Sequence, residues 1–342
     1  MKPLLSICIP TYNRGSFLKE TIKNVINEVR KVGEGYSELT EICVSDNAST
    51  DNTQSIVDEL KKDCDIPIFF KRNEKNEGPD INFLNVVAMA TGEFVWLLGS
   101  DDLLVNGSVN FIMNFIKRNK NIDIIFLVSY IYYGRFQKFD GEIGWKLEAK
   151  EKFYYYKSLA EASSTIFEKC GLISHLCFRK SRWDDINCFH NYLGLGYIHV
   201  FKVLAMLKNG SNAVLIQSPP LVVYNAFNDS IDKEYGTFAR LLMDVRSYYM
   251  IPEAVLGKAN KDAKRITEWQ LLHRFKPLLI VFTVARLSLK ERFELIREFV
   301  SYYHTFYKFY LWIYPFLFFP LGCCGHFLGI FKVEGVATRL RK

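Results

Sequence analysis

Two adjacent carboxylates, Asp101 and Asp102, follow an apolar run from Phe94 to Leu98 in the stretch TGEFVWLLGSDDLL. Two unpaired charges that are buried side by side are costly, so such a pair requires a cation. A divalent ion such as Mg²⁺ or Mn²⁺ binds carboxylate oxygens and bridges them to phosphate oxygens. The alternative is that both acids only cap the following helix, whose apolar positions include Val109 and Ile112.

Two further polar loops follow strand-like runs earlier in the chain. PTYNR ends the apolar run 4–10, and SDNASTD ends the run 39–46. In the second loop Asp51 is placed to cap a helix, whereas Asp46 is free to accept hydrogen bonds from a ligand's base or sugar. Because the carboxyl ends of parallel strands share one edge of a sheet, we expect the three loops to line one crevice.

The elements that must position these loops alternate along the chain. Strand patterns at 4–10, 39–46, 66–73 and 93–99 are separated by helical patterns. Such alternation predicts an α/β fold with a mainly parallel sheet that is covered on both faces. No G-x-G-x-x-G and no P-loop motif is present, which disfavours dinucleotide and P-loop folds. A strand is expected at 122–134 and a loop at 136–158.

Composition sets further bounds. A chain of 342 residues is long enough for two domains, and its net charge of +7 indicates an anionic partner. The eight cysteines form no C-x-x-C pair, so neither a disulfide framework nor a zinc site is indicated and a reducing compartment is expected. The N-terminus does not have the pattern of a signal peptide.

Three stretches together resemble the donor-binding half of glycosyltransferase family 2, the inverting GT-A nucleotide-sugar transferases. They are SICIPTYNRGSFLKETI, VSDNASTDNT and NEGPDINFLNVVAMATGEFVWLLGSDDLL, and they stand in the family's order and spacing. The resemblance implies a GT-A fold, Rossmann-like with a mainly parallel sheet. It also implies that the nucleotide-sugar donor is held by Pro10, Thr11, Tyr12, Asn13, Arg14, Asp46, Asn47, Asp80 and Ser100.

The third motif of that family usually holds a metal ion and the donor diphosphate. The resemblance therefore implies that Asp101 and Asp102 bind Mg²⁺ or Mn²⁺, and that Asp102 also takes part in catalysis. The first acid of the usual motif is replaced here by Gly99. This departure leaves metal affinity as a point to test.

The segment HLCFRKSRWDDINCFHNYLGLGYIHVFKVLAMLKNG resembles the acceptor side of O-antigen-type transferases such as the abequosyltransferases. Family 2 enzymes usually place a catalytic Asp or Glu at the start of the helix in this region. This sequence has His199 there, which we predict to be the base, with His190, Asp184 and Asp185 as rivals. The alternative is that His199, which stands among apolar neighbours, is a core residue.

These patterns divide the chain into a donor-binding half (1–105), an acceptor-binding half (106–235) and a helical, basic and aromatic C-terminal region (236–342). In the last region, YLWIYPFLFFPLGCCGHFLGIF (310–331) contains no formally charged residue. Pro315 and Pro320 favour a monotopic or interfacial element over a spanning helix, and a core helix or dimer interface is the third option. A membrane-associating C-terminal region is therefore expected.

The expected function is metal-dependent, inverting transfer of one sugar, from CDP-abequose or another NDP-hexose, to a polyprenyl-diphosphate-linked oligosaccharide in O-antigen assembly. Single addition is expected because the Gln-x-x-Arg-Trp motif of processive synthases is absent. The expected location is the cytoplasmic face of the inner membrane, with peripheral or monotopic attachment. The alternative is a catalytically silent nucleotide-sugar-binding or scaffold protein, and a nucleic-acid partner is disfavoured.

Overall fold

The computed structural model describes residues 2–62, 64–132, 150–187, 189–225, 230–273 and 288–303. The chain folds into two compact units. The first comprises residues 1–230 and 250–266, and the second comprises 231–249 and 267–342. All of the candidate site residues lie in the first unit. The apolar segment 310–331 lies outside the described residues.

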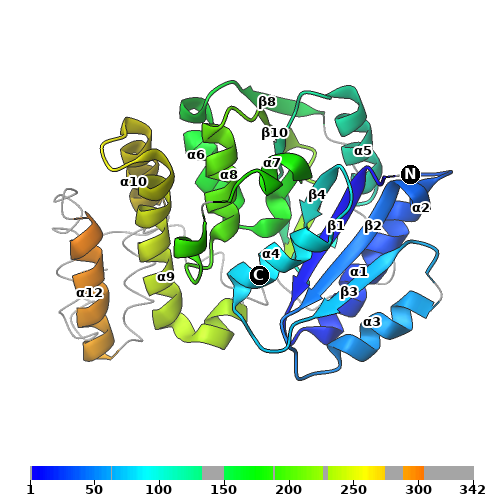
Figure 1. The fold of residues 1–342 in the computed structure, drawn as a ribbon, viewed down its shortest axis with the longest axis horizontal. Coiled ribbons are helices and arrows are strands. Elements are labelled where there is room, and N and C mark those ends of the chain that lie inside the picture. Colours follow the sequence, from blue (N-terminus) through cyan, green and yellow to red (C-terminus); the bar gives the residue numbers. More distant parts are fainter. Residues whose placement is uncertain are drawn as a thin grey trace, which may run out of the picture. The chain divides into compact units, whose positions relative to one another are not determined.

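An eight-stranded sheet forms the centre of the first unit, in the order β3-β2-β1-β4-β9-β6-β10-β8 (Figure 1). Its first four strands are parallel, and β6 is parallel to β10, whereas β9 and β8 run antiparallel to their neighbours. A smaller sheet has the order β5-β11-β7. The strands are β1 (Leu5–Thr11), β2 (Thr40–Asp46), β3 (Ile68–Arg72), β4 (Phe94–Leu97), β5 (Leu103–Leu104), β6 (Ile124–Phe126), β7 (Ser129–Tyr132), β8 (Lys152–Tyr156), β9 (Leu176–Arg179), β10 (Ala213–Ser218) and β11 (Val222–Asn225).

Helices connect the parallel strands, which confirms the predicted α/β fold with a mainly parallel sheet. The helices are α1 (Gly15–Arg30), α2 (Tyr36–Leu39), α3 (Thr53–Lys62), α4 (Pro79–Met89), α5 (Ser108–Arg118), α6 (Leu159–Cys170), α7 (Lys180–Asp184), α8 (Ile198–Lys208), α9 (Ser230–Leu256), α10 (Lys261–His273) and α12 (Leu289–Tyr303). Two 3₁₀ turns, η2 (Ile173–His175) and η3 (His190–Tyr192), lie before β9 and before α8.

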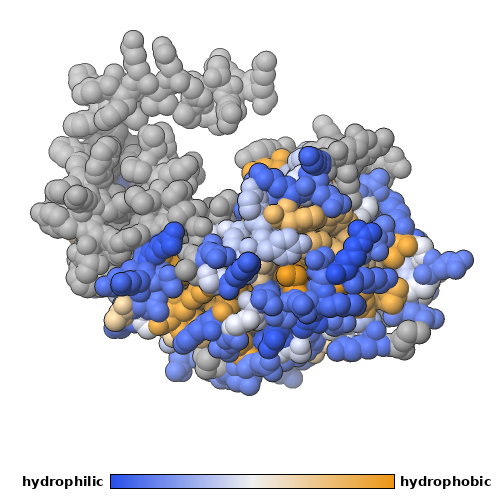
Figure 2. All heavy atoms as spheres, turned by 90° about the horizontal axis from the view of Figure 1, so that it is seen from above, coloured by the Kyte–Doolittle hydropathy of each residue, from blue (hydrophilic) through white to orange (hydrophobic). Residues whose placement is uncertain are grey.

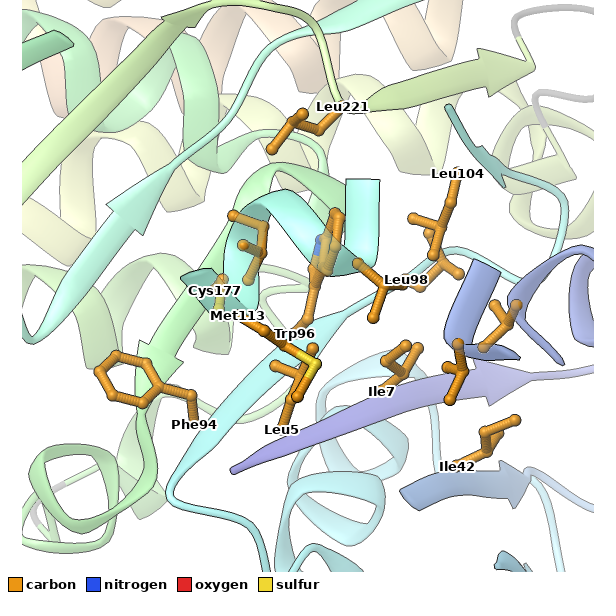
Figure 3. Packing of buried hydrophobic residues seen from close by; sticks show 14 of the residues in the cluster. Leu5, Ile7, Ile42, Phe94, Trp96, Leu98, Leu104, Met113, Cys177 and Leu221 are labelled. Atoms are coloured by element: carbon orange, nitrogen blue, oxygen red, sulfur yellow. The ribbon is translucent and has the colours of Figure 1, made fainter. Parts of the chain in front are cut away.

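The core lies on both faces of the central sheet, because successive residues of a strand point to opposite faces. Leu5 and Ile7 of β1 belong to the cluster that includes side chains of α1 and α5 (Figure 3). On the other face, the thiol of Cys8 lies 3.6 Å from the carbonyl oxygen of Val86 in α4. Burial on both faces explains why these strands are short apolar runs and do not alternate with polar residues.

Two sequence-based expectations are wrong in detail. The single strand expected at 122–134 is divided into β6 and β7, which belong to different sheets. The loop expected at 136–158 contains β8, an edge strand that pairs with β10. All residues of β8 are exposed or half-buried, so the strand needs no continuous apolar run, and its sequence KFYYY lacks the pattern of a buried strand.

Candidate active site

The carboxyl ends of β1 and β2 present a buried polar pair. Thr11 and Asp46 are the last residues of these strands and are direct partners in the sheet. Asp46 Oδ1 accepts hydrogen bonds from the backbone N–H (3.0 Å) and the hydroxyl of Ser49. Among the described residues, Asp46 Oδ2 and Thr11 Oγ1 have no hydrogen-bond partner, and the Arg72 Nε lies 3.8 Å from Asp46 Oδ2. Because buried polar atoms normally have partners, this pair is suited to bind a polar group of a ligand.

The PTYNR loop is joined to the SDNASTD loop through Asn13. Its Oδ1 accepts from the backbone N–H of Thr50 at 2.7 Å, and its own backbone N–H donates to Ser49 Oγ at 2.8 Å. Asn13 has a positive φ of 50°, a conformation that asparagine tolerates better than most residues. In the same loop Pro10 is buried and Tyr12 is half-buried. The Asn13 side chain therefore fixes the shape of the site.

Asn47 fixes a third segment, residues 73–78. Its Nδ2 donates to Asn76 Oδ1 at 2.7 Å, and its Oδ1 accepts from Asn73 Nδ2 and from the Glu77 backbone N–H, both at 3.0 Å. Asn82 Nδ2, from the first turns of α4, donates to the carbonyl oxygen of Thr11 at 3.2 Å. These amide bonds connect the loops after β1, β2 and β3 into one rigid edge.

The loop after β4 reaches the same edge through an ion pair. Arg14 Nη1 donates to Asp101 Oδ1 at 2.9 Å and lies 3.5 Å from Ser100 Oγ. The side chain of Asp101 is 11% exposed. The backbone carbonyl of Ser100 accepts from Thr21 Oγ1 at 3.1 Å, which ties the loop to α1. Thus Arg14, Ser100 and Asp101, all predicted site residues, lie together.

Asp102 is more deeply buried than Asp101 and has different partners. Its Oδ1 accepts from the backbone N–H of Asn225 at 3.0 Å, and its Oδ2 accepts from the hydroxyl of Ser174. Burial raises the pKa of Asp102 to about 7, and the adjacent Asp101 carboxylate adds to the rise. Ser174 and Asn225 were missed by sequence reasoning because no local pattern links them to the SDD motif.

Gly99 occupies its position for a steric reason. A Cβ atom on Gly99 would lie 2.7 Å from Asp102 Oδ2 and 3.3 Å from Asp101 Oδ1. The Asp102 carboxylate therefore fills the space that a side chain at position 99 would need. The Gly99 backbone N–H donates to Ser174 Oγ at 2.8 Å, so the same hydroxyl holds both ends of the loop.

Asp101 and Asp102 were the predicted metal ligands. No group of three or more His, Cys, Asp or Glu side chains that could hold a metal ion occurs in the described part of the chain. Two carboxylates supply the oxygen donors that Mg²⁺ and Mn²⁺ prefer, and Asp101, the less deeply buried of the two, fits a direct ligand better than Asp102. The remaining ligands would have to come from the donor diphosphate and water.

Asp80 has partners other than those expected for a donor ligand. Both of its carboxylate oxygens accept backbone N–H groups, from Gly194, Gly196 and Ile198. The residue is 2% exposed. It therefore connects the start of α4 to the start of α8.

His199, the predicted base, is the second residue of α8 and is 2% exposed. Its Nε2 lies 2.8 Å from the carbonyl oxygen of Cys170, which makes Nε2–H the donor, and Nδ1 has no hydrogen-bond partner among the described residues. Burial lowers the pKa of His199 to about 4. An efficient base has a pKa nearer the working pH, so these properties resemble those of a core histidine. The catalytic role stays a prediction.

Two rivals for that role lie at the wrong edge of the sheet. Arg179, the last residue of β9, pairs with the first residue of β4, so α7 follows at the edge opposite to Asp101. Asp184 is bound there by Lys180 at 2.6 Å, and Asp185 lines a surface hollow of about 430 Å³ with Arg179. The third rival, His190, is exposed.

A mainly parallel sheet gathers a buried carboxylate, an Arg–Asp pair and a second aspartate at its carboxyl edge, which is where open α/β sheets bind their ligands. The sequence profile described as Glycosyl transferase family 2 matches residues 6–179, and the chain belongs to this family. The protein is therefore a glycosyltransferase.

Two curated relatives give a narrower comparison. Abequosyltransferase RfbV of Salmonella typhimurium is 31% identical over 278 residues, which are 79% of this chain and 80% of that protein. The GalNAc(5)-diNAcBac-PP-undecaprenol beta-1,3-glucosyltransferase of Campylobacter jejuni is 38% identical over 111 residues, 32% of this chain and 34% of that protein.

Solved structures support the same fold. S. aureus TarS 1–349 in complex with UDP-GlcNAc has a TM-score of 0.54 at 13% identity and covers 88% of this chain and 90% of that one. Mannosyltransferase PcManGT from Pyrobaculum calidifontis, in complex with GDP-Man and Mn²⁺, also has a TM-score of 0.54, at 19% identity, and covers 93% and 85%. The predicted GT-A fold is confirmed.

Proposed function

We propose that this chain transfers a single hexose from a nucleotide sugar to a polyprenyl-diphosphate-linked oligosaccharide in surface polysaccharide assembly, with inversion at the anomeric carbon. CDP-abequose is our first candidate donor, and another NDP-hexose is the second. The similarity to an abequosyltransferase supports the donor class. The similarity to an enzyme whose name specifies a PP-undecaprenol substrate supports the acceptor class.

One observation carries the donor proposal. The buried oxygens of Thr11 and Asp46 without hydrogen-bond partners lie at the same sheet edge as the Arg14–Asp101 pair. Asp46 Oδ2 can accept an N–H of a base or a ribose hydroxyl, and the Arg14 guanidinium can complement phosphate oxygens. A nucleoside diphosphate has both kinds of group at its two ends.

We propose that Mg²⁺ or Mn²⁺ binds beside the diphosphate, with Asp101 as direct ligand and Asp102 as its support. When bound, such an ion supplies positive charge to the diphosphate leaving group. A structural neighbour with Mn²⁺ and GDP-Man in the same fold is consistent with this. Within the chain, Arg14 is placed to share the charge of Asp101, so the guanidinium would move toward phosphate when the metal binds Asp101.

The proposed location is the cytoplasmic face of the inner membrane, with peripheral or monotopic attachment. Within the described ranges up to residue 303, no helix is sufficiently long and apolar to cross a bilayer. On the face shown in Figure 2, hydrophobic atoms form separate small patches between hydrophilic ones. The attachment proposal therefore rests on the uncharged sequence 310–331.

A two-step experiment tests the function. A thermal-shift screen with UDP-, CDP-, GDP- and dTDP-sugars in the presence of Mn²⁺ identifies the donor, and release of the nucleoside diphosphate is then measured with and without lipid-linked acceptor. We expect release that depends on the acceptor. Binding of a nucleotide sugar without release of nucleoside diphosphate under any condition would favour the alternative of a catalytically silent binding protein. That alternative is supported by Gly99, which replaces the first acid of the usual motif.

A further inference from the structure

The carboxylate of Asp80 joins two segments that lie more than a hundred residues apart. Oδ2 accepts from the backbone N–H groups of Gly194 (2.8 Å) and Gly196 (2.9 Å), and Oδ1 accepts from that of Ile198 (3.0 Å). These sequence separations are 114, 116 and 118 residues. With both oxygens engaged and 2% exposure, the carboxylate is not available to a donor molecule.

The segment from Gly194 to Ile198 is shaped to bind an anion. Gly194 and Gly196 have φ values of 89° and 72°, which only glycine adopts readily. Alternation of such residues turns successive N–H groups to one side and forms a nest that binds negative charge. In this chain the bound anion is the side chain of Asp80.

The same carboxylate serves two helix starts. Asp80 is the second residue of α4, and Ile198 is the first residue of α8, so the negative charge lies at the amino ends of both helices. Helix amino ends favour negative charge. Burial raises the pKa of Asp80, and the N–H bonds from Ile198, Gly196 and Gly194 oppose that rise. A carboxylate without these bonds would be costly to bury.

A short path of contacts connects this arrangement to the donor loops. Asn47 is the neighbour of Asp46. Its Nδ2 donates to Asn76 Oδ1 (2.7 Å) and to the carbonyl oxygen of Gly78 (3.3 Å). Pro79 and Asp80 follow directly and begin α4. The SDNASTD loop and the segment 194–198 are therefore connected to each other through only a few residues.

We propose that Asp80 is a positioning residue that clamps the segment 194–198 and the start of α8 onto the donor half, and is not a ligand of the donor. Because Asp80 begins α4 after the carboxyl end of β3, the clamped segment lies at the same sheet edge as the donor loops, and we assign it to the acceptor side of the site. This assignment rests on the proposed function, whereas the clamp itself can be measured without any substrate.

Hydrogen exchange of the full chain tests the clamp. In Asp80→Asn the carboxamide has only one acceptor oxygen, and its NH₂ group faces the backbone N–H groups of the nest, to which it cannot bond. Backbone amides in peptides covering 193–201 are therefore expected to exchange about ten-fold faster or more. The control Glu77→Gln makes the same change of charge at an exposed position three residues earlier, and it is expected to leave that exchange unchanged. Affinity for nucleoside diphosphate, measured by calorimetry with UDP, CDP and GDP plus Mn²⁺, should stay within about three-fold in both variants.

The outcomes separate the clamp from the proposed function. Unchanged exchange of peptides 193–201 in Asp80→Asn, or a loss of nucleotide affinity beyond about ten-fold, overturns the clamp. If Asp80→Asn does not fold, Gly194→Ala strains the nest while it keeps the carboxylate, and the same two measurements decide in the same way. Where transfer can be assayed, the clamp predicts that Asp80→Asn raises KM for the acceptor more than KM for the donor. A wild-type chain that shows protected 193–201 amides but no transfer would refute the function and leave the clamp intact.

Discussion

Asp101 and Asp102 are neighbours in sequence but differ in what holds them. Asp101 is paired with Arg14 at the site, whereas Asp102 is bound by Ser174 and the Asn225 backbone within the protein. The Asp101 carboxylate can therefore exchange the Arg14 guanidinium for a metal ion. The Asp102 carboxylate instead holds its loop in place. We therefore expect different consequences when each acid is changed.

Asp101→Asn should lower turnover by at least about 10²-fold, because it removes a charge at the diphosphate, while the melting temperature changes little. EDTA should have the same effect on the wild-type protein. Nucleoside diphosphate release measures both effects, and Asp58→Asn, on the exposed face of α3, is the control. Full activity in EDTA would refute metal dependence.

Gly99→Ala should destabilise the protein by about 1–3 kcal/mol, the usual cost of overpacking, because the new Cβ would collide with the Asp102 carboxylate. A double-mutant cycle measures the cause. In an Asp102→Ala background the same glycine substitution should cost less than about 0.5 kcal/mol. Equal costs in both backgrounds, measured by urea unfolding, would mean that the collision is not the reason for glycine.

His199 makes stability depend on pH. The unfolded side chain binds a proton below about pH 6.5, whereas the folded one binds it only below about pH 4. Between these values the unfolded state holds more protons, so the free energy of unfolding falls as pH falls, by roughly 3 kcal/mol in total.

His199→Gln keeps a donor for the Cys170 carbonyl and removes the titration. Urea unfolding across this pH window should therefore show a smaller slope for the variant than for the wild type. Identical slopes would contradict the burial of an uncharged imidazole. The same variant tests catalysis, because a base contributes about 10²-fold or more to kcat, and unchanged kcat would exclude His199 as the base.

At the scale of single residues, the sequence predicted which side chains gather at the edge but not what each one contacts. Thr11 and Asp46 are the last residues of their parallel strands, and Arg14 and Asp101 follow β1 and β4, so all four lie at the predicted edge of the sheet. The partners of Asp102 could not be predicted, since Ser174 and Asn225 lie 72 and 123 residues away.

Among the elements, the junction of α1 and α3 depends on one acid. Asp51 accepts from the Thr53 backbone N–H (3.0 Å) and hydroxyl (2.5 Å), at the start of α3, and from the Gly15 backbone N–H (2.8 Å), at the start of α1. Burial opposes ionisation, but the bonds from Thr53 and Gly15 outweigh it and lower the pKa of Asp51. Asp51 therefore binds the first backbone N–H of both helices, although α3 begins at Thr53 and Asp51 lies two residues before it.

Asp51→Ala should lower the free energy of unfolding at neutral pH by about 1–2 kcal/mol, the cost of losing a helix cap. Because the folded pKa is lowered, this stabilisation holds above the unfolded value of 3.8 and is lost as pH falls below it. Asp58→Ala, an exposed change of the same type in α3, is the control. Equal stability of the two variants would refute the double cap.

Three strands of the donor half, β1, β2 and β4, were predictable because they are buried throughout and therefore read as short apolar runs. The start of α4 at Pro79 follows from the fixed φ of proline at a first helical position. Beyond Ile122 prediction was poorer. There the strands are short, and the single apolar stretch 122–134 contributes β6 to one sheet and β7 to the other. In addition, β8 is an edge strand with exposed Tyr154 and Tyr155.

For the whole molecule, the testable expectation is attachment to the membrane through the C-terminal region. The full chain should sediment with membranes, whereas a chain ending after Tyr303 should appear in the soluble fraction and still bind nucleotide, because the proposed donor-binding residues lie in the first unit. Cell fractionation with nucleotide binding measures both properties. Recovery of the full chain in the soluble fraction without detergent would refute the attachment.

The Asp80 clamp has a consequence for how acceptor preference can diversify. Its partners in the segment 194–198 are backbone N–H groups, and these do not depend on the side chains present there, apart from the two glycines. Leu195 and the residues before Gly194 can therefore be substituted without loss of the Asp80 clamp. A chimera in which this stretch is exchanged between related enzymes should retain the fold if Asp80 and both glycines are kept. The stretch is therefore a suitable segment to exchange in order to alter which acceptor sugar is used.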